Sequence, residues 1–401
     1  MLPKRLVLSL LILPGILASQ RIVVAQPPVH RIHQVGSQRT AAVVVQRSGL
    51  LHTTQLLPLD AHGRLVGPGR LEEQIDQLLD NLEALLAHFD SSTEKLVKMN
   101  VYVRDAAVWS AFTAKLTERV PSRVQPAVSF VLTKLPQGAV VGLDAIAATA
   151  NDAPRVVRTR VADWGGGERF ADVAVLPPGD AVYIAGQAER SESLAGATRA
   201  TLAGLHRTLE HMGLELSDAV QVKCFMQPMD QVDVVQSEIA KFFGEEMIPP
   251  VAYVEWISSL PIEIELVAHA PAVAFKDSVS YLTPPWMTRS PVYSRVARIH
   301  GDTRIYVSGL VAGKTGDGGE QVRNIFSSLS EIVKLAGSDL RHLAKATYYV
   351  SDGDASAKLN EFRPNYYDPR RPPSASKAVV HGIGVANRGI TIDMIAAPSG
   401  G

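Results

Sequence analysis

The chain has 401 residues, of which 46% are hydrophobic and 20% are charged, a composition typical of a soluble globular protein with about two to four domains. Its formal net charge is zero, so it has no excess of basic residues to bind the phosphates of a nucleic acid, and we expect no nucleic-acid partner. The single cysteine, Cys224, excludes an intrachain disulfide and is predicted to be a small buried residue on a strand.

The first 25 residues have the pattern of a secretory signal peptide. Lys4 and Arg5 precede an apolar run over residues 6–18, and Ala25 ends a candidate cleavage site. The run is short for a membrane span, and no later segment is long and apolar enough to be one. We therefore expect an exported protein, periplasmic or extracellular, in which residues 1–25 are the signal peptide and residues 26–40 are a polar tether. The alternative is an uncleaved N-terminal anchor.

One sequence pattern occurs three times along the chain. The three copies are Leu96–Val103 followed by Asp105, Ala219–Met226 followed by Asp230, and Leu343–Val350 followed by Asp352. Their lysines, Lys98, Lys223 and Lys345, are almost equally spaced, and an amphipathic helical stretch lies on each side of every copy. A repeat this long indicates a repeated domain rather than a solenoid unit.

The periodicity predicts the same order of elements, β-β-α-β-α-β-β, in each of three units. Unit one is residues 41–150, with strands over 41–45, 50–56, 96–103, 127–132 and 140–148 and helices over 71–88 and 107–116. Unit two is residues 166–271, with strands over 170–176, 182–187, 219–226, 251–257 and 262–268 and helices over 194–212 and 232–243. Unit three is residues 290–398, with strands over 293–299, 304–309, 343–350, 376–380 and 390–396 and helices over 321–336 and 355–362. In each unit we expect the first two strands to form a hairpin, and we place linkers at 150–166 and 271–290.

This order predicts an α+β fold, in which each unit has one sheet with helices on one face. Alternating apolar residues such as Val43 with Val45, or Val128 with Phe130, predict that the second face of each sheet is apolar too. That apolar face must be buried against another apolar surface. The three sheets of the chain can bury these faces against one another if they pack around a common axis. The expected architecture is an intramolecular pseudo-trimer.

The motifs in the three units carry a family resemblance. Unit one has Thr53-Thr54-Gln55, Gln77, Asn81-Leu82, Val97-Lys98, Tyr102-Val103, Asp105, Leu135-Pro136 and Asp144-Ala145-Ile146-Ala147. Unit two has Ala185-Gly186-Gln187, Val222-Lys223, Leu260-Pro261 and Glu263-Ile264-Glu265, and unit three has Ser308-Gly309, Gln321, Ala344-Lys345, Tyr349-Val350, Asp352 and Ile392-Asp393-Met394-Ile395-Ala396. In this order, each unit resembles the Rid family of reactive intermediate deaminases, also called the YjgF or L-PSP endoribonuclease family.

The resemblance implies a chorismate-mutase-like fold and a trimer with small-molecule pockets at its three clefts. It also implies hydrolysis of reactive enamines and imines to 2-oxo acids and ammonia, with no metal and no organic cofactor. Since the family's trimer is already present within one chain, we expect a monomer that binds a small metabolite.

The chain departs from the family pattern where deaminating members carry an arginine that binds the substrate carboxylate. Here that position falls on Val128, Val251 and Ala375. The nearby arginines that could substitute for it are Arg123, Arg370 and Arg371, which precede the strand and are expected to be solvated.

The acidic residue of the last strand is retained as Asp144, Glu265 and Asp393. In active members it is thought to hold or activate the attacking water; the alternative is a carboxylate held in a hydrogen-bond network. The turn that offers backbone groups to a ligand is Gly186 in unit two and Gly309 in unit three, whereas Thr54 replaces the glycine in unit one.

These residues define the predicted sites. The candidate catalytic residues are Asp144, Glu265 and Asp393, and the candidate substrate-binding residues are Thr54, Gly186, Gly309, Val128, Val251 and Ala375. The three repeated lysines alternate along their strands and are predicted to be solvated outward residues.

Two functions stay open at this point: an imine or enamine hydrolase with an altered pocket, or a non-catalytic metabolite-binding protein. Ribonuclease activity is the least favoured, because the chain has no net positive charge.

Overall fold

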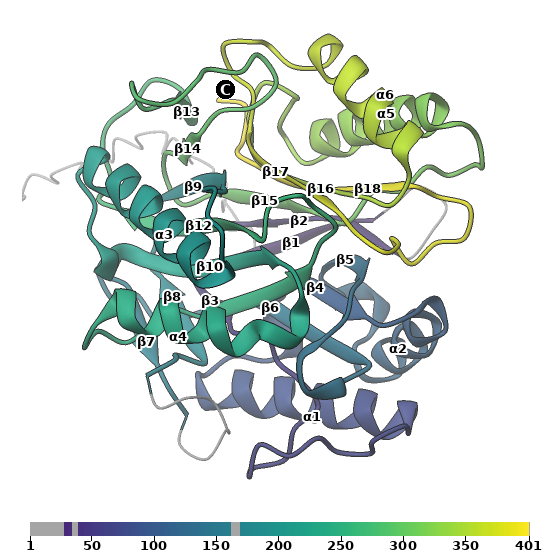
Figure 1. Cartoon of the computed structure of the whole chain (residues 1–401). Helices are drawn as coiled ribbons and strands as arrows, with labels where there is room; N and C mark the ends of the chain where they lie inside the picture. The colour runs from purple at the N-terminus through teal and green to yellow at the C-terminus, as the bar shows by residue number, and fades with distance from the viewer. Residues whose placement is uncertain (1–27, 34–38, 162–168, 401) are drawn as a thin grey trace, which may run out of the picture.

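A computed structural model describes residues 28–33, 39–161 and 169–400, and in these residues the chain forms three units of one architecture (Figure 1). Each unit has two helices: α1 Leu71–His88 and α2 Ala106–Arg119, α3 Leu194–His211 and α4 Val232–Phe243, and α5 Gly318–Leu335 and α6 Gly353–Phe362. The helices lie on the outside and the strands in the middle. The predicted signal peptide lies outside the described residues. Within them, no helix has both the length and the apolar character that crossing a bilayer requires.

The strands form three six-stranded sheets in the described part of the chain. The sheet of unit one has the order β5 Ala127–Leu132, β4 Leu96–Val103, β6 Val141–Thr149, β3 Gly49–Thr53, β8 Val173–Leu176 and β7 Val157–Thr159. The sheet of unit two has the order β11 Val251–Glu255, β10 Ala219–Met226, β12 Ile262–Ala270, β9 Asp180–Gln187, β14 Val296–Ile299 and β13 Val279–Leu282. The sheet of unit three has the order β17 Ser374–Val379, β16 Leu343–Val350, β18 Ile390–Ala396, β15 Arg304–Val307, β2 Thr40–Val45 and β1 Val29–His33.

The two outer strands of every sheet come from the segment that precedes another unit. The pair β7 and β8 precedes the rest of unit two but completes the sheet of unit one, where β8 pairs with β3. The pair β13 and β14 joins unit two through β9, and the pair β1 and β2 joins unit three through β15. The prediction of local hairpins between β2 and β3, β8 and β9, and β14 and β15 is therefore wrong. Instead, the exchanged pairs link the three sheets in a closed cycle.

Three of these exchanged strands lie in segments predicted to lack structure. β1 falls within residues 26–40, predicted to be a tether, and β7 and β13 fall within the predicted linkers. Because β1 pairs with β2, β7 with β8 and β13 with β14, these strands form the edges of the three sheets, and the segments between units are part of the sheets.

Local sequence explains where the helices begin and end. The side chain of Asp105 accepts hydrogen bonds from two backbone N–H groups at the start of α2, and Asp352 accepts one at the start of α6. The acidic residue that closes the repeated motif is thus a helix cap in units one and three. After α3 and α5, Gly213 and Gly337 adopt positive φ angles of 70° and 79°, as expected for glycines that stop a helix.

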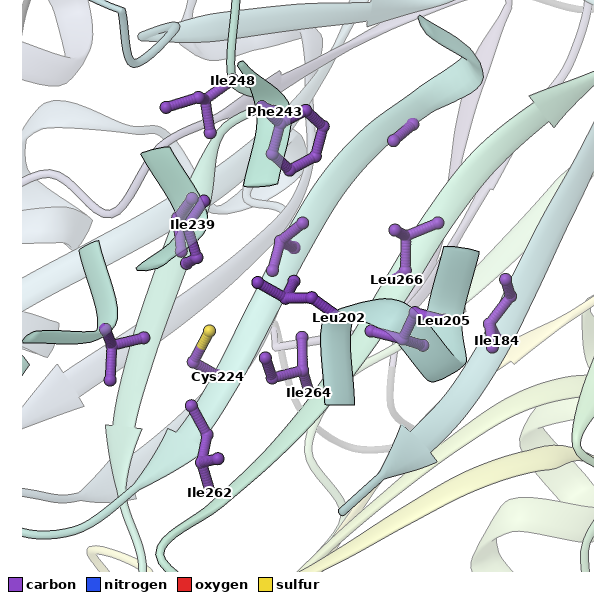
Figure 2. Close-up of a cluster of buried hydrophobic side chains, with 14 of the residues drawn as sticks. Ile184, Leu202, Leu205, Cys224, Ile239, Phe243, Ile248, Ile262, Ile264 and Leu266 are labelled. Atoms are coloured by element: carbon purple, nitrogen blue, oxygen red, sulfur yellow. The ribbon is translucent and has the colours of Figure 1, made fainter. Parts of the chain in front are cut away.

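Each unit has a core between its helices and its sheet, and a further core lies between the three sheets. The core of unit two includes Cys224, which is a buried free cysteine as predicted (Figure 2). The central core contains Val43 and Val45 together with residues of all three sheets, which confirms the shared apolar centre. Val128 and Phe130, in contrast, pack on the helix side of β5, so their predicted orientation is wrong.

Candidate functional site

The three clefts form where the turn of one unit meets the strand of another. The Thr54 hydroxyl donates to the carbonyl oxygen of Val251 at 3.1 Å, and the N–H of Gln55 donates to the same oxygen at 3.0 Å. The structure therefore brings together two residues that the sequence placed in different units. We call this place the one–two cleft.

The other two clefts repeat this arrangement. In the two–three cleft, the N–H of Gly186 donates to the hydroxyl of Ser376 at 3.1 Å, next to Ala375. In the three–one cleft, the N–H of Gly309 donates to the carbonyl oxygen of Val128 at 2.9 Å. All six predicted substrate-binding residues thus lie at the junctions between units, paired as turn and strand.

The predicted catalytic acids lie around the central axis, each beside a lysine of another unit, and Glu265 also accepts from the Ser376 hydroxyl of the two–three cleft at 2.5 Å. Lys98 pairs with Asp393 at 3.0 Å and Lys345 pairs with Glu265 at 2.5 Å. Lys223 and Asp144 complete the cycle at 3.9 Å. A cavity of about 50 Å³ lies among these side chains. We call the six residues the axial ring.

The lysines of the axial ring are buried, so the prediction that they are solvated outward residues is wrong. Lys98 is 3% exposed and donates to the Ser129 hydroxyl and to the carbonyl oxygen of Val307, both at 2.8 Å. A buried ammonium group is tolerated only when it is paired, and the acids of the last strands supply the pairs. Asp144 also accepts from Tyr102 and Asn100. The three acids are thus held in hydrogen-bond networks, which favours the alternative stated for them above.

A different carboxyl group, Glu263, reaches the two–three cleft. It lies on β12, two residues before Glu265, and its Oε1 would be 2.0 Å from a Cβ atom at Gly186, so a larger residue at the turn would displace the Glu263 side chain. Burial raises the pKa of Glu263 to about 7, and the nearby charge of Glu265 adds to the rise. Lys345, Ser376 and Arg295 oppose it.

An arginine lies near this carboxyl group although the family position is apolar: the backbone oxygen of Arg295 accepts from the N–H of Ala185, which precedes Gly186, at 2.9 Å. The Arg295 guanidinium is close enough to lower the pKa of Glu263, and its Nε is buried without a hydrogen-bond partner in the described residues. Its guanidinium carbon lies 5.0 Å from the centre of the Tyr293 ring. Arg295 directly precedes β14, one of the exchanged strands.

The arginines proposed as substitutes do not take this place. Arg123 is 70% exposed and pairs with Glu94, and Arg370 is 83% exposed and pairs with Asp368. Arg371 pairs with Asp277 at 3.1 Å.

Sequence reasoning missed both Glu263 and Arg295. One signal for Glu263 was available: the position two residues before the axial acid is Gly142 in unit one and Thr391 in unit three, so unit two alone has a carboxyl group there. Arg295, Asp172 and Ala41 occupy equivalent positions, because their backbone oxygens accept from the N–H groups of Ala185, Thr54 and Ser308. These positions carry a cation, an anion and a methyl group.

The one–two cleft contains a cavity of about 520 Å³. Its lining includes three aspartates, five amide side chains and two aromatic rings: Asp60, Asp80, Asp172, Gln55, Gln77, Asn81, Gln137, Gln236, Phe170 and Tyr253. No lysine, arginine or histidine is among the described residues that line it. The cavity therefore has the opposite charge preference to the two–three cleft.

The three–one cleft is filled by hydrogen bonds between protein groups. The Ser308 hydroxyl donates to the carbonyl oxygen of Thr40 at 2.7 Å and accepts from the N–H of Val128 at 3.1 Å. A Cβ atom at Gly309 would be 2.9 Å from the hydroxyl of Ser129. Its equivalents of Glu263 and Arg295 are Thr391 and Ala41, so this cleft offers neither a carboxyl group nor a guanidinium at those positions.

Comparison with known proteins agrees with this architecture. The family model described as "Endoribonuclease L-PSP" matches the chain three times, over residues 38–149, 168–270 and 288–397. The chain belongs to this family. Each match of the L-PSP family model spans one of the three units, and together the three matches cover most of the chain.

Two curated relatives match a stretch of this chain about as long as one unit. The chain is 33% identical over 118 residues to the RutC family protein UK114 of Drosophila melanogaster, covering 29% of this chain and 83% of that protein. It is 30% identical over 105 residues to a RutC family protein of Synechocystis, covering 26% and 81%.

Solved structures give the same coverage. A Rid family protein of unknown function from Yersinia pestis is 23% identical and covers 30% of this chain and 99% of its own, with a TM-score of 0.28. A YjgF family protein from Neisseria meningitidis is 19% identical and covers 31% and 97%, with a TM-score of 0.24.

Proposed function

We propose that the chain hydrolyses imines or enamines that carry a carboxylate, and that the reaction takes place in the two–three cleft. The observation that carries this proposal is the placement of Glu263 against the Gly186 turn, with the Arg295 guanidinium close by. A carboxyl group can exchange a proton with water, and a guanidinium can bind a substrate carboxylate with two parallel hydrogen bonds. The two groups supply the chemistry that the apolar residues Val128, Val251 and Ala375 do not.

The proposed reaction has two steps. In the first, Glu263 removes a proton from a water molecule while the water oxygen bonds to the carbon of the protonated imine, and the electrons of the C=N bond move to nitrogen, which gives a neutral carbinolamine. In the second, Glu263 returns its proton to the amino nitrogen, the carbon–nitrogen bond breaks to release ammonia, and the hydroxyl proton passes back to Glu263 as the carbonyl group forms; Glu263 then loses this proton to solvent. A carboxyl group with a pKa of about 7 suits both roles, because it can take up and release a proton near neutral pH.

A direct assay tests this function. Imines are generated from several amino acids by an amino-acid oxidase, and their loss is followed in the presence and absence of the protein. We expect the protein to accelerate hydrolysis of imines with a free carboxylate. If no imine in the panel disappears faster than in buffer, the proposal is wrong.

Ribonuclease activity, which the family description names, is less well supported. RNA binding depends on basic groups that neutralise phosphates, and this chain has equal numbers of basic and acidic residues. We expect no cleavage of single-stranded RNA under conditions in which imines are hydrolysed.

We also propose that the protein is exported, on the evidence of the basic and apolar pattern in residues 1–25. Cell fractionation and N-terminal sequencing test this; recovery of the uncleaved chain in the cytoplasm would contradict it.

For assembly we propose a monomer, because the three sheets already enclose a common core. Sedimentation should give the mass of one chain, which is 43.2 kDa before removal of the signal peptide.

A further inference from the structure

The cavity in the one–two cleft is lined by groups that favour a cation. Asp60 pairs with Arg64 and Asp80 pairs with Arg119, and both lie toward the surface. Asp172 differs from them because it is only 6% exposed, and its Oδ2 accepts from the N–H of Val161 at 2.8 Å. Burial raises the pKa of Asp172, while the N–H of Val161 and the nearby Arg160 oppose the rise. Because none of the described residues that line the cavity itself is basic, the carboxylate favours a cation on its cavity side.

A second observation at the same cavity points to a ligand. Tyr253 is 5% exposed and lines the cavity, yet its hydroxyl has no hydrogen-bond partner of good geometry in the described residues, with Gln236 as the side chain beside it. Buried hydroxyl groups are nearly always hydrogen-bonded, so one left unpaired beside a cavity marks a place for a polar atom of a ligand. Phe170 adds a second aromatic ring, while Leu57 and Val251 make part of the lining apolar.

The equivalent position in the two–three cleft carries the opposite charge. Asp172 and Arg295 precede β8 and β14 at the same distance from their turns. A ligand carboxylate that suits Arg295 would meet the carboxylate of Asp172 in the one–two cleft and be repelled.

We propose that the cavity in the one–two cleft is a second ligand site, which binds an organic ammonium ion. Its charged group faces the carboxylate of Asp172, and its carbon skeleton lies against Phe170 and Val251. Ammonium ions are recognised by carboxylates and by aromatic faces, and this cavity has both. The site does not depend on the hydrolase activity proposed for the other cleft.

Three probes of similar size and different charge test the proposal on the full chain. They are 2-phenylethylamine, 2-phenylethanol and 3-phenylpropionate, added in thermal-shift and calorimetric titrations. We expect the amine to raise the melting temperature and to bind at least about tenfold more tightly than the alcohol, with no binding of the carboxylate at this site. Equal binding of the alcohol, or preference for the carboxylate, would overturn the proposal.

Two variants assign the binding to the cavity. Asp172→Asn keeps the shape of the side chain and removes its charge, and should weaken amine binding about tenfold. Asp152→Asn removes the same charge from an exposed loop position outside the cavity and should change nothing. Unchanged binding in D172N would show that the ammonium group does not face Asp172.

A third variant keeps the test valid if D172N folds poorly. Gln137 is exposed at the edge of the cavity, so Gln137→Lys adds a positive charge there without disturbing a core. Amine binding should weaken severalfold and depend less on salt. If Q137K binds the amine as the wild type does, the proposal fails. Amine binding in Glu263→Gln should match the wild type, which separates this site from the proposed reaction centre.

Discussion

The one–two and two–three clefts share one fold but have opposite chemistry. In the two–three cleft, Glu263 and Arg295 lie close to each other beside a glycine turn. In the one–two cleft, the equivalent positions are Gly142 and Asp172, and this cleft contains a cavity of about 520 Å³ that Asp172 lines. In a trimer of identical chains every substitution appears at all three clefts. A fused chain removes this constraint, so each cleft can carry its own charge.

Glu263→Gln should have the largest effect, because it removes the proposed base from the two–three cleft while keeping its shape. We expect imine hydrolysis to fall by a factor of about 100 or more, the usual contribution of a positioned acid or base. The assay is the oxidase-coupled imine assay. Glu245→Gln, at an exposed position after α4, is the matched control and should keep full activity. A fully active E263Q would remove Glu263 from the mechanism.

Arg295→Gln should have the next largest effect, and it should act on substrate binding. We expect KM for imines with a carboxylate to rise at least about tenfold, because the guanidinium supplies a charge-assisted hydrogen bond. An imine without a carboxylate should be unaffected, and that comparison separates carboxylate binding from a general loss of structure. Arg190→Gln, an exposed position, is the control. Equal losses for both kinds of substrate would contradict the assigned role.

Gly186→Ala should reduce activity about tenfold by displacing Glu263. The new methyl group would lie 2.0 Å from the present position of Glu263 Oε1, so the carboxyl group must move away from the turn. Gly353→Ala, where no atom lies within 4 Å of the added Cβ, is the matched control. Steady-state kinetics of both variants decide the point, and an unchanged rate in G186A would mean that the position of Glu263 at the turn does not matter.

The pKa of Glu263 also predicts how stability depends on pH. Since burial and Glu265 raise this pKa from 4.5 to about 7, the folded protein keeps a proton there between pH 4.5 and 7 that the unfolded chain releases. This group therefore stabilises the fold below pH 4.5 relative to higher pH, and stability falls as the pH rises to 7. Urea unfolding of both proteins at pH 5 and pH 8 tests this. From pH 5 to pH 8, the free energy of unfolding of E263Q minus that of the wild type should rise by roughly 1–3 kcal/mol. An equal difference at the two pH values would contradict the raised pKa.

Much of the fold follows from local patterns. The threefold repeat, the spacing of apolar residues in the helices, and stop signals such as Gly213 and Gly337 depend on residues close in sequence, and the structure confirms them. The pairing of the first strands of each unit does not follow from local patterns. Strands β2 and β3 are separated by a short turn, and their apolar pattern is satisfied equally well by a neighbour in the same unit or in another.

The site was harder to predict, because its chemistry depends on contacts between units. Lys98 resembles a solvated strand residue until Asp393, from another unit, is placed 3.0 Å away. Glu263 and Glu265 lie two residues apart on one strand, so periodicity puts both on the same face and cannot tell which reaches the cleft and which the axis. That distinction comes from the position of the neighbouring unit, which brings Ser376 and Gly186 beside them.

The exchanged strand pairs have a thermodynamic consequence. Because every sheet borrows two strands from the segment before another unit, no unit can melt without opening a sheet that a second unit needs. Heat or urea should therefore unfold the whole chain in one transition, although its length would allow three. A ligand held at a single cleft would then protect all three units equally from proteolysis.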